Sequence, residues 1–285
     1  YSPKRVYSPP PAVVDDLLDL HKTLHMERVV IVQPSIYAAD NGCTLDAVRK
    51  LGARARGVAV IDKDTSKAEL EEMDAIGVRG IRINLNTTPT GEIDADNSKR
   101  TLDMAVEKIR AYGWHIQFYT RPHIIAALKP HIEQLPFPVV FDHFGGPKAA
   151  EGPNQAGYDA LLDLVKAGRA YVKISGAYRI SEKGPDFADT TPFAQALVAA
   201  NPERIIWGSD WPHPGSAPRP LTELAPPIPV DDGLLLNQVP KWIPDAATRE
   251  KIFVANPARL YGFGEAAEVV TSSGRTPRPA AAPAQ

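Results

Sequence analysis

The sequence predicts an α/β fold, a (β/α)8 TIM barrel, from three observations. Short apolar runs rich in Val and Ile recur along the chain, as expected of parallel strands that helices cover. Helical patterns separate these runs, and such alternation indicates a parallel sheet. The number of repeated units then favours closure of the sheet into a barrel.

Each element can be assigned from its pattern. The runs expected to form strands are 28–34, 56–62, 77–85, 114–120, 138–144, 170–176 and 204–210. The helices expected between them are 44–51, 66–76, 97–112, 122–134, 154–168 and 188–200. A further helix is expected near 245–254, and another, residues 13–26, precedes the first run.

The strand pattern is one short of a complete barrel of this type, because the chain opens with a Pro-rich stretch and a helix. We therefore expect a barrel that lacks its first strand, with that strand upstream of Tyr1 in a longer protein. A different element that fills the gap is the alternative.

The chain divides into one predicted domain and a tail. Residues 1–264 are expected to form a single catalytic barrel domain, and residues 265–285 a disordered tail rich in Pro and Ala. Residues 211–233 form a long loop with many prolines after the last strand. Because barrel active sites lie on that side, the loop is expected to be a lid or a substrate wall.

Composition excludes several classes of partner. The net charge of −2 and the pI of about 6.4 do not indicate the excess of positive charge that binds nucleic acid or an anionic membrane. No apolar run approaches the roughly 20 residues of a membrane helix. Cys43 is the single cysteine, which fits a reducing compartment, and the N-terminus lacks the apolar core of a signal peptide. We expect a cytoplasmic protein with a small-molecule substrate; its oligomeric state stays open.

Strand ends supply the candidate catalytic residues. Side chains two apart share a face of a strand, and barrel enzymes work at the carboxyl ends of their strands. Asp210 closes the last run, RIIWGSD. His143 closes PVVFDHF in a set with Val139 and Phe141, which is expected to leave Asp142 pointing the other way. The simpler interpretation of Asp210 is a helix cap or turn, and that of His143 is a hydrogen-bonded turn residue.

Four further residues are expected near the same mouth. Arg82 lies within a strand, where a buried charge needs an anionic partner or ligand. Tyr119 closes another strand, Arg179 follows the run 170–176, and Ser35 follows the run 28–34. An exposed loop arginine and a rim aromatic are the simpler interpretations of Arg179 and Tyr119.

Two histidine patterns are given less weight. His21 and His25 have a spacing that can chelate a metal, but their helix lies outside the predicted barrel. The stretch 211–214, Trp-Pro-His-Pro, is interpreted as a rigid turn, although His213 could approach a substrate.

Four stretches together resemble a known family. These are VVFDHFGGPK (139–148), YVKISGAYR (171–179), IIWGSDWPHP (205–214) and FVANPARLYGF (253–263). They are similar to motifs of the amidohydrolase superfamily, and more narrowly of the lactonase group that contains the 2-pyrone-4,6-dicarboxylate hydrolases. The resemblance extends from about Tyr1 to Phe263.

The resemblance implies roles for these residues. Asp210 would be the general base that activates water, and His143 would polarise the lactone carbonyl. Arg82 and Arg179 would bind substrate carboxylates. The remaining candidates, which would hydrogen-bond the ligand, are Tyr119, Ser35 and Tyr7.

Two departures from the family pattern affect the substrate and the site. Nothing in the chain matches the His-x-His of the family's first strand. The dicarboxylate enzymes also carry a second arginine beyond the Arg82 position, where this chain has Thr88. That difference leaves room for a monoacid or sugar-acid lactone.

The sequence therefore predicts a hydrolase that opens a carboxylated lactone by Asp-activated water, with no metal and no cofactor. Catalytic zinc usually takes three protein ligands, and Tyr119 stands where metal-dependent relatives place a histidine. The alternatives are a lactone isomerase acting on a sugar-acid lactone and a metal-dependent amidohydrolase or decarboxylase of the superfamily. A non-catalytic binding protein or an inactive fragment is the alternative in which the chain is not an enzyme.

Overall fold

The computed structural model describes residues 1–86 and 95–264 and contains one parallel sheet in these ranges. Its strand order follows the chain from β1 to β7. The strands are β1 (Val29–Val32), β2 (Ala55–Ala59), β3 (Val78–Asn84), β4 (His115–Tyr119), β5 (Val139–Phe141), β6 (Ala170–Ser175) and β7 (Ile205–Gly208). Each of the expected runs overlaps one of them, so the parallel α/β prediction is confirmed.

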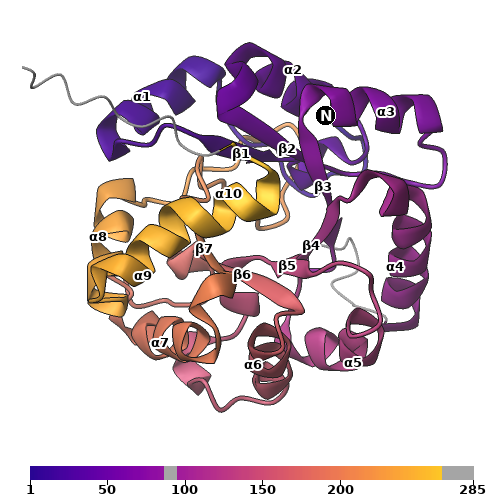
Figure 1. Cartoon of the computed structure of the whole chain (residues 1–285). Coiled ribbons are helices and arrows are strands. Elements are labelled where there is room, and N and C mark those ends of the chain that lie inside the picture. The colour runs from indigo at the N-terminus through magenta and orange to yellow at the C-terminus, as the bar shows by residue number, and fades with distance from the viewer. Residues whose placement is uncertain (87–94, 265–285) are drawn as a thin grey trace, which may run out of the picture.

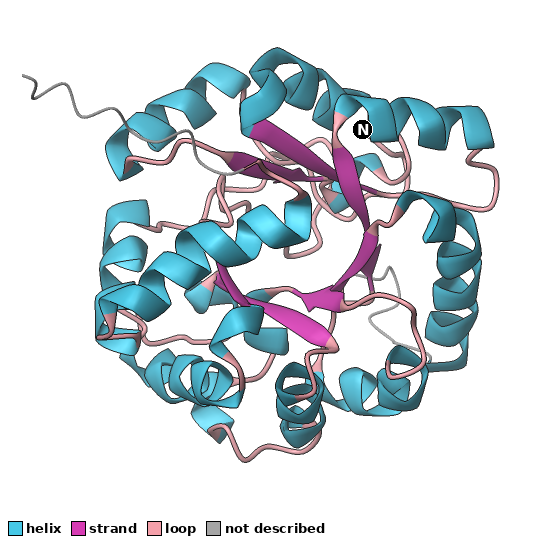
Figure 2. Ribbon diagram, in the orientation of Figure 1, coloured by secondary structure: helices cyan, strands magenta, loops and turns pink. Residues whose placement is uncertain are grey.

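Helices surround the strands as an outer layer (Figures 1 and 2). They are α1 (Val14–Leu24), α2 (Gly42–Leu51), α3 (Lys67–Ile76), α4 (Ala95–Ile109), α5 (Pro122–Ile132), α6 (Tyr158–Lys166), α7 (Thr191–Ala200), α8 (Asp232–Trp242), α9 (Ala246–Glu250) and α10 (Asn256–Tyr261). The sequence patterns predicted all of these except α8 and α10. Within the described ranges, none of the helices is long and apolar enough to cross a membrane.

Local sequence sets the bounds of these helices, as α3 illustrates. The Ser66 hydroxyl accepts from the backbone N–H of Glu69, and the Glu69 carboxylate accepts from the backbone N–H of Ser66 at 2.7 Å. This reciprocal cap satisfies two donors that a helix start leaves unpaired. At the other end Gly77 adopts a φ of 116°, where a side chain would be strained, and the helix stops.

The sheet curls into an incomplete barrel. Each strand from β2 to β6 pairs on both sides, whereas β1 pairs only with β2 and β7 only with β6 within the described residues. An eighth strand is therefore not found in the ranges 1–86 and 95–264. The predicted tail, 265–285, and Thr88 lie outside the described residues.

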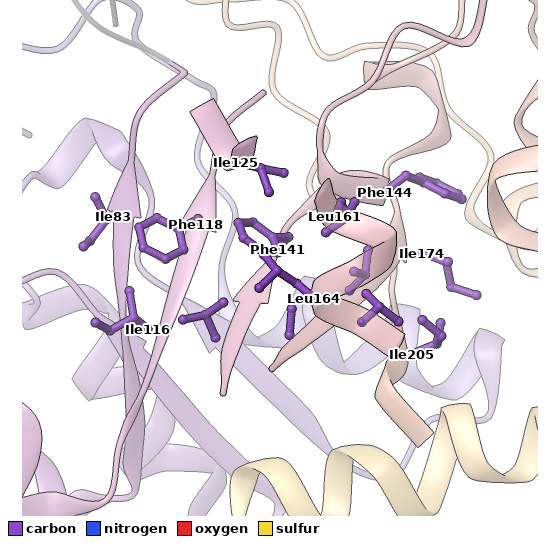
Figure 3. Close-up of a cluster of buried hydrophobic side chains, with 14 of the residues drawn as sticks. Ile83, Ile116, Phe118, Ile125, Phe141, Phe144, Leu161, Leu164, Ile174 and Ile205 are labelled. Atoms are coloured by element: carbon purple, nitrogen blue, oxygen red, sulfur yellow. The ribbon is translucent and has the colours of Figure 1, made fainter. Parts of the chain in front are cut away.

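The outer face of the sheet holds the main hydrophobic core. Figure 3 shows strand side chains such as Phe118, Phe141 and Ile174 beside Leu161 and Leu164, which come from α6. All five are fully buried. Burial of one such side chain contributes about 1.5–3 kcal/mol, so this layer fixes the helices on the strands.

The inner face of the sheet is apolar at the end of the barrel opposite the carboxyl ends of the strands. Tyr261 and Phe263, at the end of α10 and just after it, pack there against inward side chains of four strands. Those side chains are Val58, Val140, Tyr171 and Ile206. The C-terminal segment thus closes one end of the barrel interior, and the polar residues of the strand ends lie at the other.

Candidate active site

A cavity of about 670 Å³ lies at the carboxyl ends of the strands. It also extends along the unpaired edges of β1 and β7 toward α1 and α10. All of the residues proposed from the sequence line it: Tyr7, Ser35, Arg82, Tyr119, His143, Arg179 and Asp210. The structure therefore brings the expected acid, imidazole, guanidinium and phenol groups to one cavity.

The expected facing of β5 is wrong in one respect. Val140 points into the barrel and Phe141 toward the helices, so Asp142 follows Val140 inward and lines the cavity. His143 does not reach the cavity by strand alternation, because β5 ends at Phe141. A 3₁₀ turn at His143–Gly145, in which His143 has a φ of 48°, directs its side chain to the site instead.

Asp142 is the centre of a buried polar network. Its carboxylate accepts hydrogen bonds from Gln117 Nε2 at 2.9 Å and from Arg82 Nε at 3.3 Å, and it pairs with Lys173 Nζ at 3.2 Å. Burial opposes ionisation, but the charges of Lys173 and Arg82 hold the pKa of Asp142 far below its ordinary value. The anion that the sequence analysis required for Arg82 is therefore Asp142.

Arg82 and Lys173 remain part of the cavity wall while they hold Asp142. In the described part of the chain only Nε of Arg82 donates a hydrogen bond, and the guanidinium carbon lies 5.2 Å from the Tyr119 ring centroid. Burial lowers the pKa of Lys173, against the attraction of Asp142. Two basic groups are thus held in place beside the cavity by one carboxylate.

Asp210 is held by one of its two oxygens. Its Oδ2 accepts a hydrogen bond from Tyr178 Oη at 2.5 Å and one from Arg179 Nε. Its Oδ1 lies 3.7 Å from His143 Nε2. Burial would raise the pKa of Asp210, but the charge of Arg179 and the hydrogen bonds from Tyr178 and Arg179 hold it below its ordinary value.

His143 faces Asp210 as a neutral imidazole. Burial lowers its pKa, although Asp210 and Asp142 act in the opposite direction. Its Nδ1 lies 3.1 Å from Ser175 Oγ, and the Tyr119 ring packs edge-on at 5.2 Å. Because a carboxylate stands opposite Nε2, we assign the proton of the neutral ring to Nε2, with Ser175 donating to Nδ1.

Gly176 is required by the close approach of this acid and imidazole. It follows β6 with a φ of 56°. A Cβ at this position would lie 2.7 Å from His143 Nδ1 and 3.2 Å from Asp210 Oδ2. The absence of a side chain therefore lets the turn after β6 pass beside both groups.

The loop 211–233 lines one side of the cavity, as the sequence predicted for a substrate wall. Trp211, Pro212 and Pro214 contribute to the lining, and Pro214 is bridged to Pro227 across the loop. Ala225 packs with Tyr7 and Ile36, which lie on the N-terminal segment and on the 3₁₀ turn after β1. The N-terminal segment and this loop therefore form one wall.

The donor set does not fit a metal centre. Among residues 1–86 and 95–264 no group of three or more His, Cys, Asp or Glu side chains comes together. Asp210 also carries the cationic Arg179 on Oδ2, which opposes a metal cation at the same carboxylate. Of the two histidines singled out near α1, His21 lies on the helix and lines the part of the cavity that extends toward it. Burial lowers the pKa of His21.

Sequence reasoning missed several residues of the site. Lys173 shares a strand face with Tyr171 and Ser175, so alternation alone could have identified it. Tyr178 gave no signal beyond its position next to Arg179. His213 was interpreted as part of a turn, yet it is buried and contacts Tyr178 at 2.9 Å.

Comparison with known proteins gives a consistent result. The profile described as Amidohydrolase matches residues 1–263. A 4-sulfomuconolactone hydrolase of Rhizobium radiobacter is 36% identical over 92% of this chain and 84% of its own length. A 2-pyrone-4,6-dicarboxylate hydrolase of Comamonas testosteroni is 33% identical over 92% and 84%. A D-galactarolactone isomerase of Agrobacterium fabrum is 32% identical over 87% and 80%.

A solved structure supports the fold. A protein of Acinetobacter baumannii, described as a probable 2-pyrone-4,6-dicarboxylic acid hydrolase, aligns with a TM-score of 0.77 and 24% identity. The alignment covers 92% of this chain and 94% of the other. The seven-stranded arrangement is thus that of an α/β barrel of this kind with one strand fewer.

The Asp142 network generates a stability prediction. Asp142→Asn leaves Arg82 and Lys173 buried without their anion, and loss of one partner of a buried pair costs about 3–5 kcal/mol. We expect that decrease in the free energy of unfolding, measured by urea denaturation. The matched control is Asp163→Asn, whose 2.6 Å pair with Lys129 is exposed and should cost under about 1 kcal/mol. Equal small losses in both variants would contradict the role assigned to Asp142.

Proposed function

The chain belongs to the amidohydrolase family, and we propose that it opens the ring of an anionic lactone with water activated by Asp210. The observation that carries the proposal is the approach of Asp210 Oδ1 to within 3.7 Å of His143 Nε2 inside the cavity. One group is an ionised carboxylate and the other a neutral imidazole, which are the forms needed for a base and a hydrogen-bond donor.

Asp210 takes the role of general base. Its Oδ2 is occupied by Tyr178 and Arg179, which leaves Oδ1 as the atom directed toward His143. A water at Oδ1 gives its proton to Asp210 as its oxygen attacks the lactone carbonyl carbon. The lowered pKa of Asp210 keeps the carboxylate ionised at neutral pH, so the base is in its active form.

His143 stabilises the intermediate. Attack converts the carbonyl oxygen to an oxyanion, and the Nε2–H of His143 donates to that oxygen. Collapse of the intermediate re-forms the carbonyl and breaks the ring C–O bond. The departing oxygen takes the proton from Asp210, so lactone and water give the open hydroxy acid and the base is restored.

The charge of the cavity supports an anionic substrate. Three basic side chains, Arg82, Lys173 and Arg179, pair with the two carboxylates Asp142 and Asp210. The planar guanidinium of Arg82 can bind both oxygens of a carboxylate through the donors that Asp142 does not use. The names of the two hydrolase relatives also specify lactones that carry sulfonate or carboxylate groups.

Replacement of the base tests the proposal. Asp210→Asn should lower kcat on carboxylated lactones by about 10²–10⁴-fold, because an amide cannot accept the proton of water. Ring opening is followed by acid release over a panel of mono- and dicarboxylated lactones. The exposed Asp163→Asn serves as a control and should retain wild-type turnover. Wild-type turnover in Asp210→Asn itself would rule the mechanism out.

Lactone isomerisation is a second candidate, favoured by the similarity to D-galactarolactone isomerase. In this reaction Asp210 would remove a proton from a substrate hydroxyl, and that oxygen rather than water would attack the carbonyl. The same base and the same oxyanion donor serve both reactions, so the geometry of Asp210 and His143 does not separate them.

Isotope labelling distinguishes the two reactions. If the enzyme is a hydrolase, turnover in ¹⁸O-water puts one labelled oxygen into the carboxylate of the product, as mass spectrometry would show. An unlabelled product with the mass of the substrate would instead identify the isomerase.

Metal independence is also part of the proposal, supported by the donor set around Asp210 and by its contact with Arg179. We expect turnover of the purified protein to survive dialysis against a chelator, with no stoichiometric metal in elemental analysis. Chelator-sensitive turnover that zinc restores would contradict this part of the proposal.

A further inference from the structure

We propose that His213, anchored by Asp232, positions Tyr178 and through it the carboxylate of Asp210. The inference rests on the proposed function, in which Asp210 is the base. His213 and Asp232 lie beyond the contacts that the mechanism above requires, so their part would be to hold the base rather than to touch the substrate.

A continuous line of side chains connects the two aspartates. Tyr178 Oη lies 2.5 Å from Asp210 Oδ2 and 2.9 Å from His213 Nδ1. His213 Nε2 lies 3.0 Å from Asp232 Oδ2. The imidazole of His213 is about as inaccessible as a core residue, at 5% exposure, and the Asp232 side chain is 13% exposed.

Three separate segments supply this line. Tyr178 lies in the 3₁₀ turn after β6, Asp210 just past β7, His213 in the following loop and Asp232 in the first turn of α8. A carboxylate is stabilised at a helix N-terminus, which suits Asp232 as the outer anchor. Such an alignment of segments is not needed for packing alone.

The number of available protons sets the direction of the hydrogen bonds along this line. Tyr178 has a single hydroxyl proton, so it can donate to Asp210 or to His213 but not to both. When it donates to Asp210, its oxygen can accept a hydrogen bond from Nδ1–H of His213. An Nδ1–H of His213 therefore commits the phenol proton to Oδ2 of Asp210, and Oδ1 stays available to take the proton of water.

The backbone also fixes Asp210 and His213 relative to each other. Asp210 and His213 both adopt left-handed conformations, with φ values of 64° and 56°. The N–H of His213 donates to the carbonyl of Asp210 at 3.2 Å, and the N–H of Ile228 donates to the carbonyl of His213 at 2.9 Å. Non-glycine residues seldom adopt this conformation, and such strain clusters at functional sites.

Two kinds of measurement test the inference on the whole protein. In ligand-free protein, the titration of the Asp210 carboxyl is followed by infrared difference spectroscopy, with Asp210→Asn to assign the band. Tyr178→Phe should move that titration to higher pH, because Asp210 loses a donor that favours its ionised form. His213→Ala should move it in the same direction, because the Tyr178 hydroxyl is no longer held with its proton directed at Oδ2 of Asp210. The acid limb of the kcat/KM profile should move in the same direction.

Kinetics provide the second readout. Each single variant should lower kcat by up to about 100-fold with little change in KM, since a misplaced base affects the transition state more than binding. The double variant should be no worse than the more damaging single variant, because the two residues act as one unit. His213→Asn, whose amide can donate near the Nδ1 position, should recover part of the loss.

The controls separate the possible failures. His123→Ala, on the exposed side of α5, should change neither titration nor turnover. A folded His213→Ala protein with unchanged Asp210 titration would overturn the positioning role. If the wild-type protein hydrolyses none of the lactones, the proposed function fails, whereas the titration in ligand-free protein still decides the role of His213.

Discussion

The burial of two carboxylates at one end of a barrel is the constraint on which the site depends. A buried carboxylate is costly unless cations and hydrogen bonds compensate for lost water. Asp142 receives Arg82 and Lys173, and Asp210 receives Arg179 with the phenol of Tyr178. Both pKa values lie below their ordinary range, so both carboxylates stay ionised at neutral pH.

The two carboxylates differ in what their partners leave available. Asp142 contacts Gln117, Arg82 and Lys173. It therefore fixes the two basic side chains in the cavity wall. Asp210 is bound mainly through Oδ2, so Oδ1 faces His143 across a gap of 3.7 Å. In the proposed mechanism, one carboxylate therefore organises substrate recognition, and the other performs the proton transfer.

Backbone turns bring these groups together at three neighbouring strand ends. His143 after β5, Gly176 after β6 and Asp210 after β7 all have positive φ values, of 48°, 56° and 64°. The turn after β5 directs the His143 side chain to a place that strand alternation would not give it. Gly176 has no side chain because one would collide with the His143 ring.

These turns also explain which features the sequence could predict. The strands were predictable because buried parallel strands read as continuous apolar runs, and Asp210 was found because it ends such a run. Asp142 was misplaced because Val139 and Phe141 were assigned to the inner face of the sheet, whereas Val140 points inward and Asp142 follows it. The role of His213 depends on tertiary contacts with Tyr178 and Asp232, 35 and 19 positions away, which no local pattern encodes.

A crystal structure of the Asp210→Asn variant with a slowly reacting carboxylated lactone tests the central claim most directly. That claim is that base and imidazole converge on one carbonyl while the cations hold the anionic group. We predict the lactone carbonyl oxygen within hydrogen-bond distance of His143 Nε2, the carbonyl carbon facing residue 210, and the carboxylate beside Arg82. A lactone bound with its carbonyl directed away from His143, or outside this cavity, would contradict the account.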